Sequence, residues 1–302
     1  MSLLVRKFLQ YYWSRAKRKD AKRMAAQKPG PGVAQVRDLP YIDDQNPMHL
    51  LDIYYPEGTG GLLPLIIDIH GGGWMYGNKE LNRYYGLSLA AQGFVVAGMN
   101  YRLLPETDLR GQVQDIFACL HWLEAHGREH HCDPERVFIT GDSAGGHLAA
   151  LAICITLNPE LQKLYRVTPA AFPFRAAAIS HGVCKLRGKS LSGFKAVDRE
   201  MFRLWFGNKP EENPLYGRSG FEEAAQGLRL PPIMLISSEP DQYHYQSLDM
   251  EGYLRSAGGT YRTKFWKREQ GKHLGHVFHI LYPHWQESRE TNQEMIAFFQ
   301  EF

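Results

Sequence analysis

Two short glycine-rich runs hold the residues whose types and spacing could do chemistry. The later run, Gly141-Asp-Ser-Ala-Gly-Gly146, embeds Ser143 in a Gly-x-Ser-x-Gly pattern. It follows an apolar, strand-like run and precedes a helix-like one, which is the context of a nucleophile placed on a sharp strand-to-helix turn. Glycines around such a turn let neighbouring backbone pass without a Cβ clash. The pattern therefore predicts a nucleophilic serine at position 143.

The earlier run, His70-Gly-Gly-Gly-Trp74, can supply what a serine nucleophile needs next. Attack on a carbonyl creates an oxyanion, which is stabilised by N–H donors aimed at it. This run also follows an apolar, strand-like segment, so its glycines can turn their amides toward the same site. The N–H of Ala144, which follows the nucleophile at a helix N-terminus, would complete an oxyanion hole.

A serine nucleophile also needs a base and an acid that orients the base. On this type of sheet the chain order is serine, acid, histidine. The apolar run ending at Ser238 leads into Glu239-Pro-Asp241, and we choose Asp241 as the acid, with Glu239 as the rival. Three histidines follow near the last strand, and we favour His276 as the base. The other two, His273 and His279, are expected to be solvated loop residues.

Strand-like and helix-like segments, which must position these residues, alternate along the chain after the turn-forming run Pro29-Gly-Pro-Gly32. Strands are expected at 34–38, 50–55, 65–69, 94–100, 137–140, 176–180, 233–237 and 261–267. Helices are expected at 81–92, 109–126, 144–157, 244–257 and 285–302. This alternation predicts an α/β fold, with a mostly parallel sheet covered on both faces and antiparallel first strands.

The basic charge of the chain is concentrated at its N-terminus. Residues 1–35 hold nine Lys and Arg and one acid, whereas the remainder holds 26 Lys and Arg against 31 acids. Leu4, Phe8, Tyr12 and Ala16 recur at a spacing of four, which predicts an amphipathic helix. We favour packing of this helix on its own domain as part of a cap. Membrane-surface contact by residues 1–28 is a less favoured alternative, and no other feature supports nucleic-acid binding.

The remaining organisation follows from segment lengths. The stretch between the strands at 176–180 and 233–237 is too long for a simple crossover, so we expect a helical cap insert at 183–230. The expected divisions are 1–35 for the basic helix, 36–182 and 231–302 for the two parts of the core, and the insert between them. Four aromatic residues are the predicted substrate-pocket residues, namely Trp74, Tyr76, Trp205 and Phe206.

Composition narrows the class of protein. Hydrophobic residues make up 44% of the chain, which is ordinary for a globular protein, and the longest apolar runs are too short or too interrupted to cross a bilayer. A secretory signal peptide needs an uninterrupted apolar segment, which Arg6 and Lys7 interrupt, so we predict a cytoplasmic protein. The four cysteines show no metal or disulfide spacing and are expected to be reduced.

Together these motifs resemble those of the hormone-sensitive-lipase-like branch of the α/β-hydrolase superfamily. The resemblance also includes Tyr101-Arg-Leu-Leu-Pro-Glu106 and His276-Val-Phe278, and it runs from about Leu51 to the C-terminus. It implies an eight-stranded α/β-hydrolase fold, a helical cap, and ester hydrolysis with no cofactor or metal. It further implies oxyanion donors at Gly71, Gly72 and Ala144. The chain departs from the family at Ser180-His181-Gly182, where a proline is frequent.

The predicted function is that of a serine carboxylic ester hydrolase for short-chain acyl or aromatic esters, which works through an acyl-enzyme. A carbohydrate acetyl esterase and a formamidase-type amidase are alternatives, because the same triad serves all three. A non-catalytic binding module is the hypothesis from another class, but such a module is expected to lack a triad member. The expected partner is a small-molecule ester, and a homodimer is left open.

Overall fold

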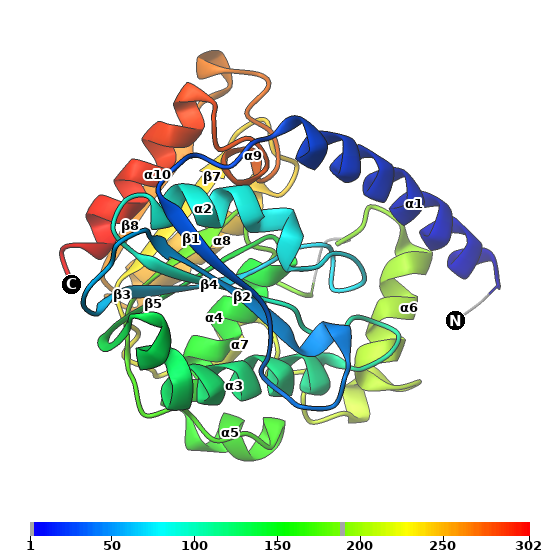
Figure 1. Ribbon diagram of the computed structural model, residues 1–302. Helices are drawn as coiled ribbons and strands as arrows, with labels where there is room; N and C mark the ends of the chain where they lie inside the picture. Colours follow the sequence, from blue (N-terminus) through cyan, green and yellow to red (C-terminus); the bar gives the residue numbers. More distant parts are fainter. Residues whose placement is uncertain (1–2, 188–190) are drawn as a thin grey trace.

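The computed structural model describes residues 3–187 and 191–302, which centre on one eight-stranded sheet with helices on both faces (Figure 1). The strand order is β1-β2-β4-β3-β5-β6-β7-β8. The strands are β1 (Val33–Pro40), β2 (Leu50–Pro56), β3 (Leu63–Ile69), β4 (Val95–Met99), β5 (Cys132–Asp142), β6 (Phe174–Ser180), β7 (Ile233–Ser238) and β8 (Tyr261–Trp266). Pairings of β1 with β2 and of β2 with β4 are antiparallel, and the rest are parallel. The predicted α/β-hydrolase fold is confirmed.

The helices connect these strands and cover the sheet. They are α1 (Leu3–Ala26), α2 (Arg83–Ala90), α3 (Leu109–His126), α4 (Ala144–Leu157), α5 (Pro159–Tyr165), α6 (Lys195–Phe206), α7 (Phe221–Ala224), α8 (His244–Ser256), α9 (Phe278–Leu281) and α10 (Gln286–Phe299). Short 3-10 turns cover 47–49, 79–82, 127–130, 210–212 and 268–270. Helices α5, α7 and α9 were not predicted from the sequence, because segments this short show too little periodicity.

Alternation along the strands builds a core on each face of the sheet. On β3, Leu65, Ile67 and Ile69 pack with the apolar faces of α3, α4 and α8. Ile66, between them, points to the opposite face, where α2 and α10 supply the partners. The central strands are buried on both faces, as expected of parallel strands covered by helices.

The strand register brings the two glycine-rich runs together. Ile69 at the end of β3 pairs with Gly141 at the end of β5. Asp142 pairs in turn with Ser180 at the end of β6, and Ser180 pairs with Ile236 of β7. Since these strands are parallel, the loops that follow them leave the sheet at one edge. This edge is where the candidate site forms.

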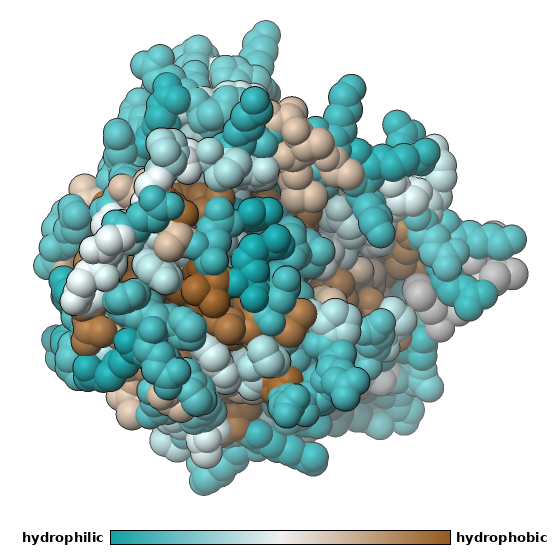
Figure 2. Space-filling model, in the orientation of Figure 1, coloured by the Kyte–Doolittle hydropathy of each residue, from teal (hydrophilic) through white to brown (hydrophobic). Residues whose placement is uncertain are grey.

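Helix α1 lies across this edge, beside α6 of the insert (Figure 1). Its C-terminal end is anchored: Arg23 Nη1, and Gln27 Nε2 just after the helix, donate to the carbonyl of Leu281 at 3.1 and 2.6 Å. The outward side of α1 is largely hydrophilic, and hydrophobic side chains are visible in the recess between α1 and the body (Figure 2). Among the described residues, no helix combines the length and the apolar character that crossing a membrane requires.

Candidate active site

Ser143 occupies a strained turn between β5 and α4. Its backbone has φ 52° and ψ −116°, which an ordinary residue adopts only when its surroundings enforce it. Those surroundings are hydrogen bonds: the N–H of Ser143 donates to the Ser180 carbonyl at 2.9 Å, and the N–H of Val183 donates to the Ser143 carbonyl at 3.0 Å. Gly145 is required because a Cβ there would collide with the carbonyl of Ile69. The turn leaves Ser143 half-buried and lining a pocket.

Asp241 and His276 lie in hydrogen-bond contact although they are far apart in sequence. Nδ1 of His276 is 2.9 Å from Oδ2 of Asp241, and because a carboxylate only accepts, we place the ring proton on this nitrogen. Glu239 turns the other way: its carboxylate accepts from Lys267 Nζ at 3.1 Å and from the Arg268 N–H at 3.0 Å, at the surface. The geometry thus joins His276 with Asp241 and leaves Glu239 in a surface ion pair.

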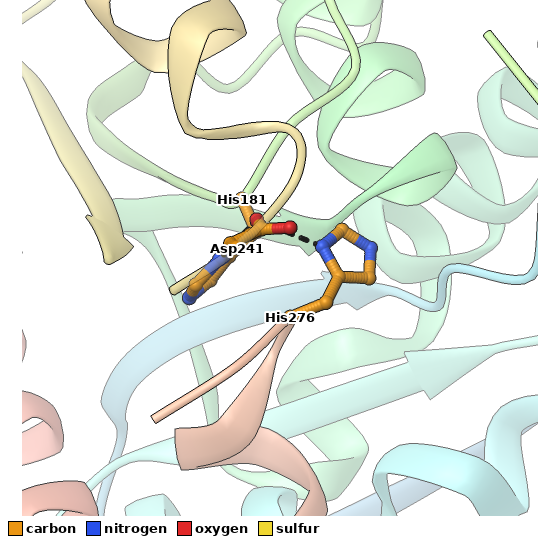
Figure 3. A group of neighbouring side chains, drawn as sticks. All are labelled: His181, Asp241 and His276. Atoms are coloured by element: carbon orange, nitrogen blue, oxygen red, sulfur yellow. Dashed lines mark hydrogen bonds and ion pairs between the residues drawn. The ribbon is translucent and has the colours of Figure 1, made fainter. Parts of the chain in front are cut away.

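The Asp241 carboxylate has two further donors. The N–H of Tyr243 reaches Oδ1 at 3.0 Å, and Nδ1 of His181 lies 2.7 Å from Oδ2. Figure 3 shows Asp241 between the two imidazole rings. Burial raises the pKa of Asp241, but the hydrogen bonds from His181 and His276 lower it by more, so that its pKa lies below its ordinary value. Asp241 is therefore a carboxylate at neutral pH.

The His276–Asp241 pair lies next to the pocket that contains Ser143. Tyr243 lines the pocket that contains Ser143, and its ring centroid is 5.1 Å from that of His276. His276 also lies close enough to Asp142, the neighbour of Ser143, to oppose the rise that burial causes in the pKa of that carboxyl. Ser143 follows β5, Asp241 follows β7, and His276 lies between β8 and α9, so the three residues come from the same edge of the sheet in the expected chain order.

The glycine loop after β3 differs in one respect from expectation. Gly71 was predicted to be an oxyanion donor. Its N–H instead donates to Asp142 Oδ1 at 2.9 Å inside the protein, so it is not free to bind an oxyanion. Gly72 and Gly73 adopt φ of 116° and 59°, and Gly73 lines the pocket beside Ser143. Within the described ranges, the N–H groups of Gly72, Gly73 and Ala144 donate to no protein acceptor. The free donors are therefore one residue further along the loop.

Two buried carboxyl groups, those of Asp68 and Asp142, lie beneath the glycine loop, on the side of the sheet. Asn82 Nδ2 donates to Asp68 Oδ2 at 3.0 Å and to Asp142 Oδ1 at 2.9 Å. Burial raises the pKa of Asp68 well above its ordinary value, and the nearby Asp142 charge adds to the rise. Asp142 thus binds both Asn82 and the Gly71 N–H. Sequence reasoning missed this group, because Asn82 was placed inside the helix expected at 81–92, whereas it ends a 3-10 turn before α2.

The pocket beside Ser143 is small and apolar, with a volume of about 120 Å³. Trp74 lines it as predicted, but Tyr76, Trp205 and Phe206 do not. Trp205 is buried one layer behind, edge-on to Trp74 with centroids 4.8 Å apart, because the preceding turn of α6 faces the pocket instead. The other lining residues come mostly from α1 and the insert: Phe8, Leu9, Tyr12, Trp13, Gly73, Met75, Val183, Leu191, Ser192, Phe194, Val197, Met201, Gln242 and Tyr243.

His147 joins the glycine loop to the insert. It accepts from Trp74 Nε1 at 3.2 Å on Nδ1, and its Nε2 lies 2.7 Å from the carbonyl of Ser219. Burial lowers the pKa of His147 to about 4, so the ring is neutral and can accept on one nitrogen while it donates from the other. Its position directly after Gly145-Gly146 was the available signal, and the sequence prediction did not use it.

His273 and His279 were both expected to be solvated loop residues. For His279 this prediction is wrong: it is fully buried, with Nδ1 2.7 Å from Asn292 Oδ1 and Nε2 against the Ser180 hydroxyl. It belongs to α9, whose short apolar turn carries it into the core. His273 is half-exposed, with Nε2 3.6 Å from Glu287.

One grouping in the described chain has the donor atoms that a metal would need. His181, Asp241 and His276 each offer a ligand atom, and these atoms lie within 4.8 Å of one another. Both imidazole Nδ1 atoms already bind the carboxylate, at 2.7 and 2.9 Å, so we interpret the group as hydrogen-bonded rather than metal-binding. The four cysteines are free thiols, and all are buried.

Fold and site together define an α/β-hydrolase of the hormone-sensitive-lipase-like esterase branch, as the motifs predicted. The chain belongs to the BD-FAE family, whose sequence model matches residues 51–243.

Curated relatives carry esterase names. Isoprenylcysteine alpha-carbonyl methylesterase ICME of Arabidopsis thaliana is 32% identical over 233 residues, which are 68% of this chain and 49% of that protein. Esterase LipQ of Mycobacterium tuberculosis is 31% identical over 241 residues, which are 77% of this chain and 56% of that protein. The chain thus spans about half the length of these relatives.

Solved structures match over the whole chain. Esterase B from Lactobacillus rhamnosis superposes with a TM-score of 0.93 and 37% identity, covering 99% of this chain and 95% of that one. The same esterase has been solved with a C4-C4 tributyrin phosphonate inhibitor, at a TM-score of 0.94. A bacterial heroin esterase matches at a TM-score of 0.71 and 22% identity, a likeness of fold alone.

Proposed function

We propose that this protein is a serine carboxylic ester hydrolase whose triad is Ser143, His276 and Asp241. The observation that carries the proposal is the hydrogen bond between His276 Nδ1 and Asp241 Oδ2, which lies beside Tyr243, a wall of the pocket that contains the strained Ser143. With Nδ1–H bound to the carboxylate, Nε2 is the nitrogen left to accept a proton. The esterase names of the relatives support the same chemistry.

The mechanism follows from these positions. Nε2 of His276 takes the proton of the Ser143 hydroxyl as its oxygen attacks the ester carbonyl, and Asp241 stabilises the imidazolium that forms. The N–H groups of Gly72, Gly73 and Ala144 stabilise the oxyanion. His276 then gives its proton to the leaving alcohol, which leaves an acyl group on Ser143. Water, deprotonated by His276, releases the acid and regenerates the serine.

The pocket favours short acyl chains. Its walls are bulky side chains such as Trp13, Trp74 and Met201, and the space between them is about 120 Å³, well below the few hundred that larger ligands need. Esterase B of Lactobacillus rhamnosis has been solved with a C4-C4 tributyrin phosphonate, an inhibitor with short chains, which supports short-chain esters as substrates. Short-chain acyl esters, including those with aromatic leaving groups, are the proposed substrates. A carbohydrate acetyl ester or a formamide would present an equally small acyl group to the same triad.

Replacing Ser143 by Ala tests the proposal. Turnover of p-nitrophenyl acetate should fall by a factor on the order of 10⁴ or more, because the covalent route is lost. Ser256→Ala, at the exposed end of α8, is the matched control and should retain wild-type turnover. A fluorophosphonate should add its mass to the wild type and to the control only. Full turnover by Ser143→Ala would overturn the proposal.

Acyl length tests the substrate class separately. Among acetyl, butyryl and octanoyl p-nitrophenyl esters, kcat/KM should be greatest for acetyl or butyryl. A preference for octanoyl would contradict the small pocket, without touching the triad. Acetylated sugars and N-formyl amides belong in the same panel, since greater kcat/KM on either would assign the alternative substrate class.

A further inference from the structure

Asp241 has a second imidazole partner, which the reaction described above does not use. His181 Nδ1 lies 2.7 Å from Oδ2, the same oxygen that His276 contacts at 2.9 Å (Figure 3). His181 follows the last residue of β6 and is fully buried. Burial lowers the pKa of His181 more than the Asp241 contact raises it, so the ring is neutral. A neutral ring facing a carboxylate must donate, which places its proton on Nδ1.

The ring of His181 is held by groups other than Asp241. Its backbone N–H donates to the Ile236 carbonyl at 2.7 Å, and the backbone of His181 has a positive φ of 49°. The ring of His279 lies nearly parallel to it at 6.2 Å, and Phe278 meets it edge-on at 6.0 Å. His279 is itself fixed by Asn292. The donor is therefore placed independently of the carboxylate that it contacts.

We propose that His181 is a positioning residue, which holds the Asp241 carboxylate in the orientation and charge distribution that direct His276 toward Ser143. The proposal rests on the proposed function, because it assigns His181 a role only through that triad. The Tyr243 N–H holds Oδ1, and His181 holds Oδ2 from the side opposite His276. The carboxylate therefore keeps its orientation while the proton on His276 Nε2 comes and goes.

The second donor also tunes the proton transfer. His276 faces Asp241, His181, the Tyr243 ring and the Asp142 carboxyl. His181 faces, in addition, the buried His279 and the half-buried His244 at the start of α8. A neutral donor on Oδ2 draws charge away from the contact with His276. Without it, more of the carboxylate's charge would remain at the contact with His276, and the positive ring that forms during proton transfer would be held more tightly.

Two substitutions separate positioning from simple core filling. His181→Asn keeps an N–H where Nδ1 stands, and Asn tolerates a positive φ. His181→Phe keeps a ring of similar shape and removes the donor. The loss of Nε2 costs neither variant a hydrogen bond, because among the described residues Nε2 of His181 has no partner. Urea unfolding of both variants reports any purely structural loss.

The experiment is the pH dependence of kcat and KM on p-nitrophenyl acetate. For His181→Phe we expect kcat to fall on the order of tenfold with KM nearly unchanged, and the acid limb of kcat/KM to move up by about half a pH unit or more. His181→Asn should stay within a few-fold of wild type, with the wild-type acid limb. An unmoved acid limb in a folded His181→Phe, or equal losses in the two variants, would overturn the proposal.

A spectroscopic measurement decides the case in which His181→Phe does not fold. Wild-type proton NMR should show two low-field imidazole N–H resonances, one from each ring bound to Asp241. His181→Asn should lose one and retain the other, which His276→Asn should remove. A single resonance in the wild type that His181→Asn leaves in place would overturn the proposal. Failure of the proposed function would look different, because Ser143→Ala would then remain active whatever His181 does.

Discussion

The indole of Trp13 lies flat on the ring of Tyr76, with centroids 4.9 Å apart and planes 9° from parallel. Trp13 belongs to α1, and Tyr76 belongs to the turn that closes the glycine loop, where its N–H donates to the Gly72 carbonyl at 3.0 Å. The Tyr76 hydroxyl also donates to Asp20 of α1 at 2.9 Å. The N-terminal helix is therefore in direct contact with the loop that carries the free amide donors, and it forms part of the pocket wall.

Removing the Trp13 ring should widen the pocket. In Trp13→Ala, we expect the ratio of kcat/KM on octanoyl to acetyl p-nitrophenyl ester to rise by about tenfold, since the wall is lost and the loop loses its stacking partner. Tyr11→Ala is the control: Tyr11 is on the same helix, is 59% exposed and does not line the pocket. An unchanged ratio in Trp13→Ala would show that α1 does not limit the acyl chain.

Deleting residues 1–28 separates the two interpretations of α1. As part of a cap, its loss should change the substrate profile and lower the melting temperature, because Arg23, Trp13 and Leu9 all contact the body. As an anionic-lipid anchor, its loss would abolish only binding to vesicles of acidic phospholipid. Wild-type acyl preference and melting temperature in the truncated protein, together with lost vesicle binding, would reject the cap.

Adding a methyl group at Gly72 should strongly reduce activity. Gly72 has φ 116°, and a Cβ there would collide with the Tyr76 carbonyl, so the turn that aims the Gly72 and Gly73 amides could not form. Losing one oxyanion donor costs about 2.7 to 4 kcal/mol, so we expect kcat to fall at least about a hundredfold in Gly72→Ala.

Gly93→Ala is the matched control for this collision. Gly93 also has a positive φ, of 93°, but a Cβ there would meet nothing within 4 Å. It therefore introduces similar backbone strain without the clash, and kcat should stay close to wild type although stability falls slightly. Equal losses of kcat in the two variants would indicate that strain, rather than the shape of the loop, explains the effect.

Stability should fall as the pH is lowered from 7 to 4. Burial lowers the pKa values of His70 and His147 to about 4 and that of His279 to about 3. The unfolded chain therefore binds more protons than the folded one below the ordinary histidine value of 6.5, so this stability is present above pH 6.5 and is lost as the pH falls through about 4. Asp68 and Asp142, whose pKa values are raised, act in the opposite direction, whereas Asp241, whose pKa is lowered by its two imidazole partners, acts in the same direction as the histidines.

Urea unfolding across this pH range measures the effect. The free energy of unfolding should decrease toward low pH, and His284→Asn, at an exposed loop position, should leave the slope unchanged. A free energy that stays constant or increases as the pH falls would show that the buried imidazoles are not neutral in the folded state.

Local sequence determined much of the fold. The helices at 109–126 and 144–157 end where their apolar periodicity ends, and all eight expected strands are present. Ser143 and the glycines around it were recognisable because a strained strand-to-helix turn needs those residue types at consecutive positions. Asp241 and His276 could be chosen because each follows a strand, and the ends of parallel strands meet at one edge.

What the sequence left undecided depends on contacts between distant segments. Only the packed structure gives the Gly71 N–H to Asp142, brings His181 against Asp241 over 60 residues of chain, and seats Trp13 on Tyr76. It also turns Val197 and Met201 of α6 toward the pocket and Trp205 behind it. The sequence by itself determined which residues could be nucleophile, acid and base, because those depend on residue type and local backbone. Tertiary structure decided which backbone amides remain free and which side chains shape the pocket. Both depend on which residues from distant parts of the chain are packed against them.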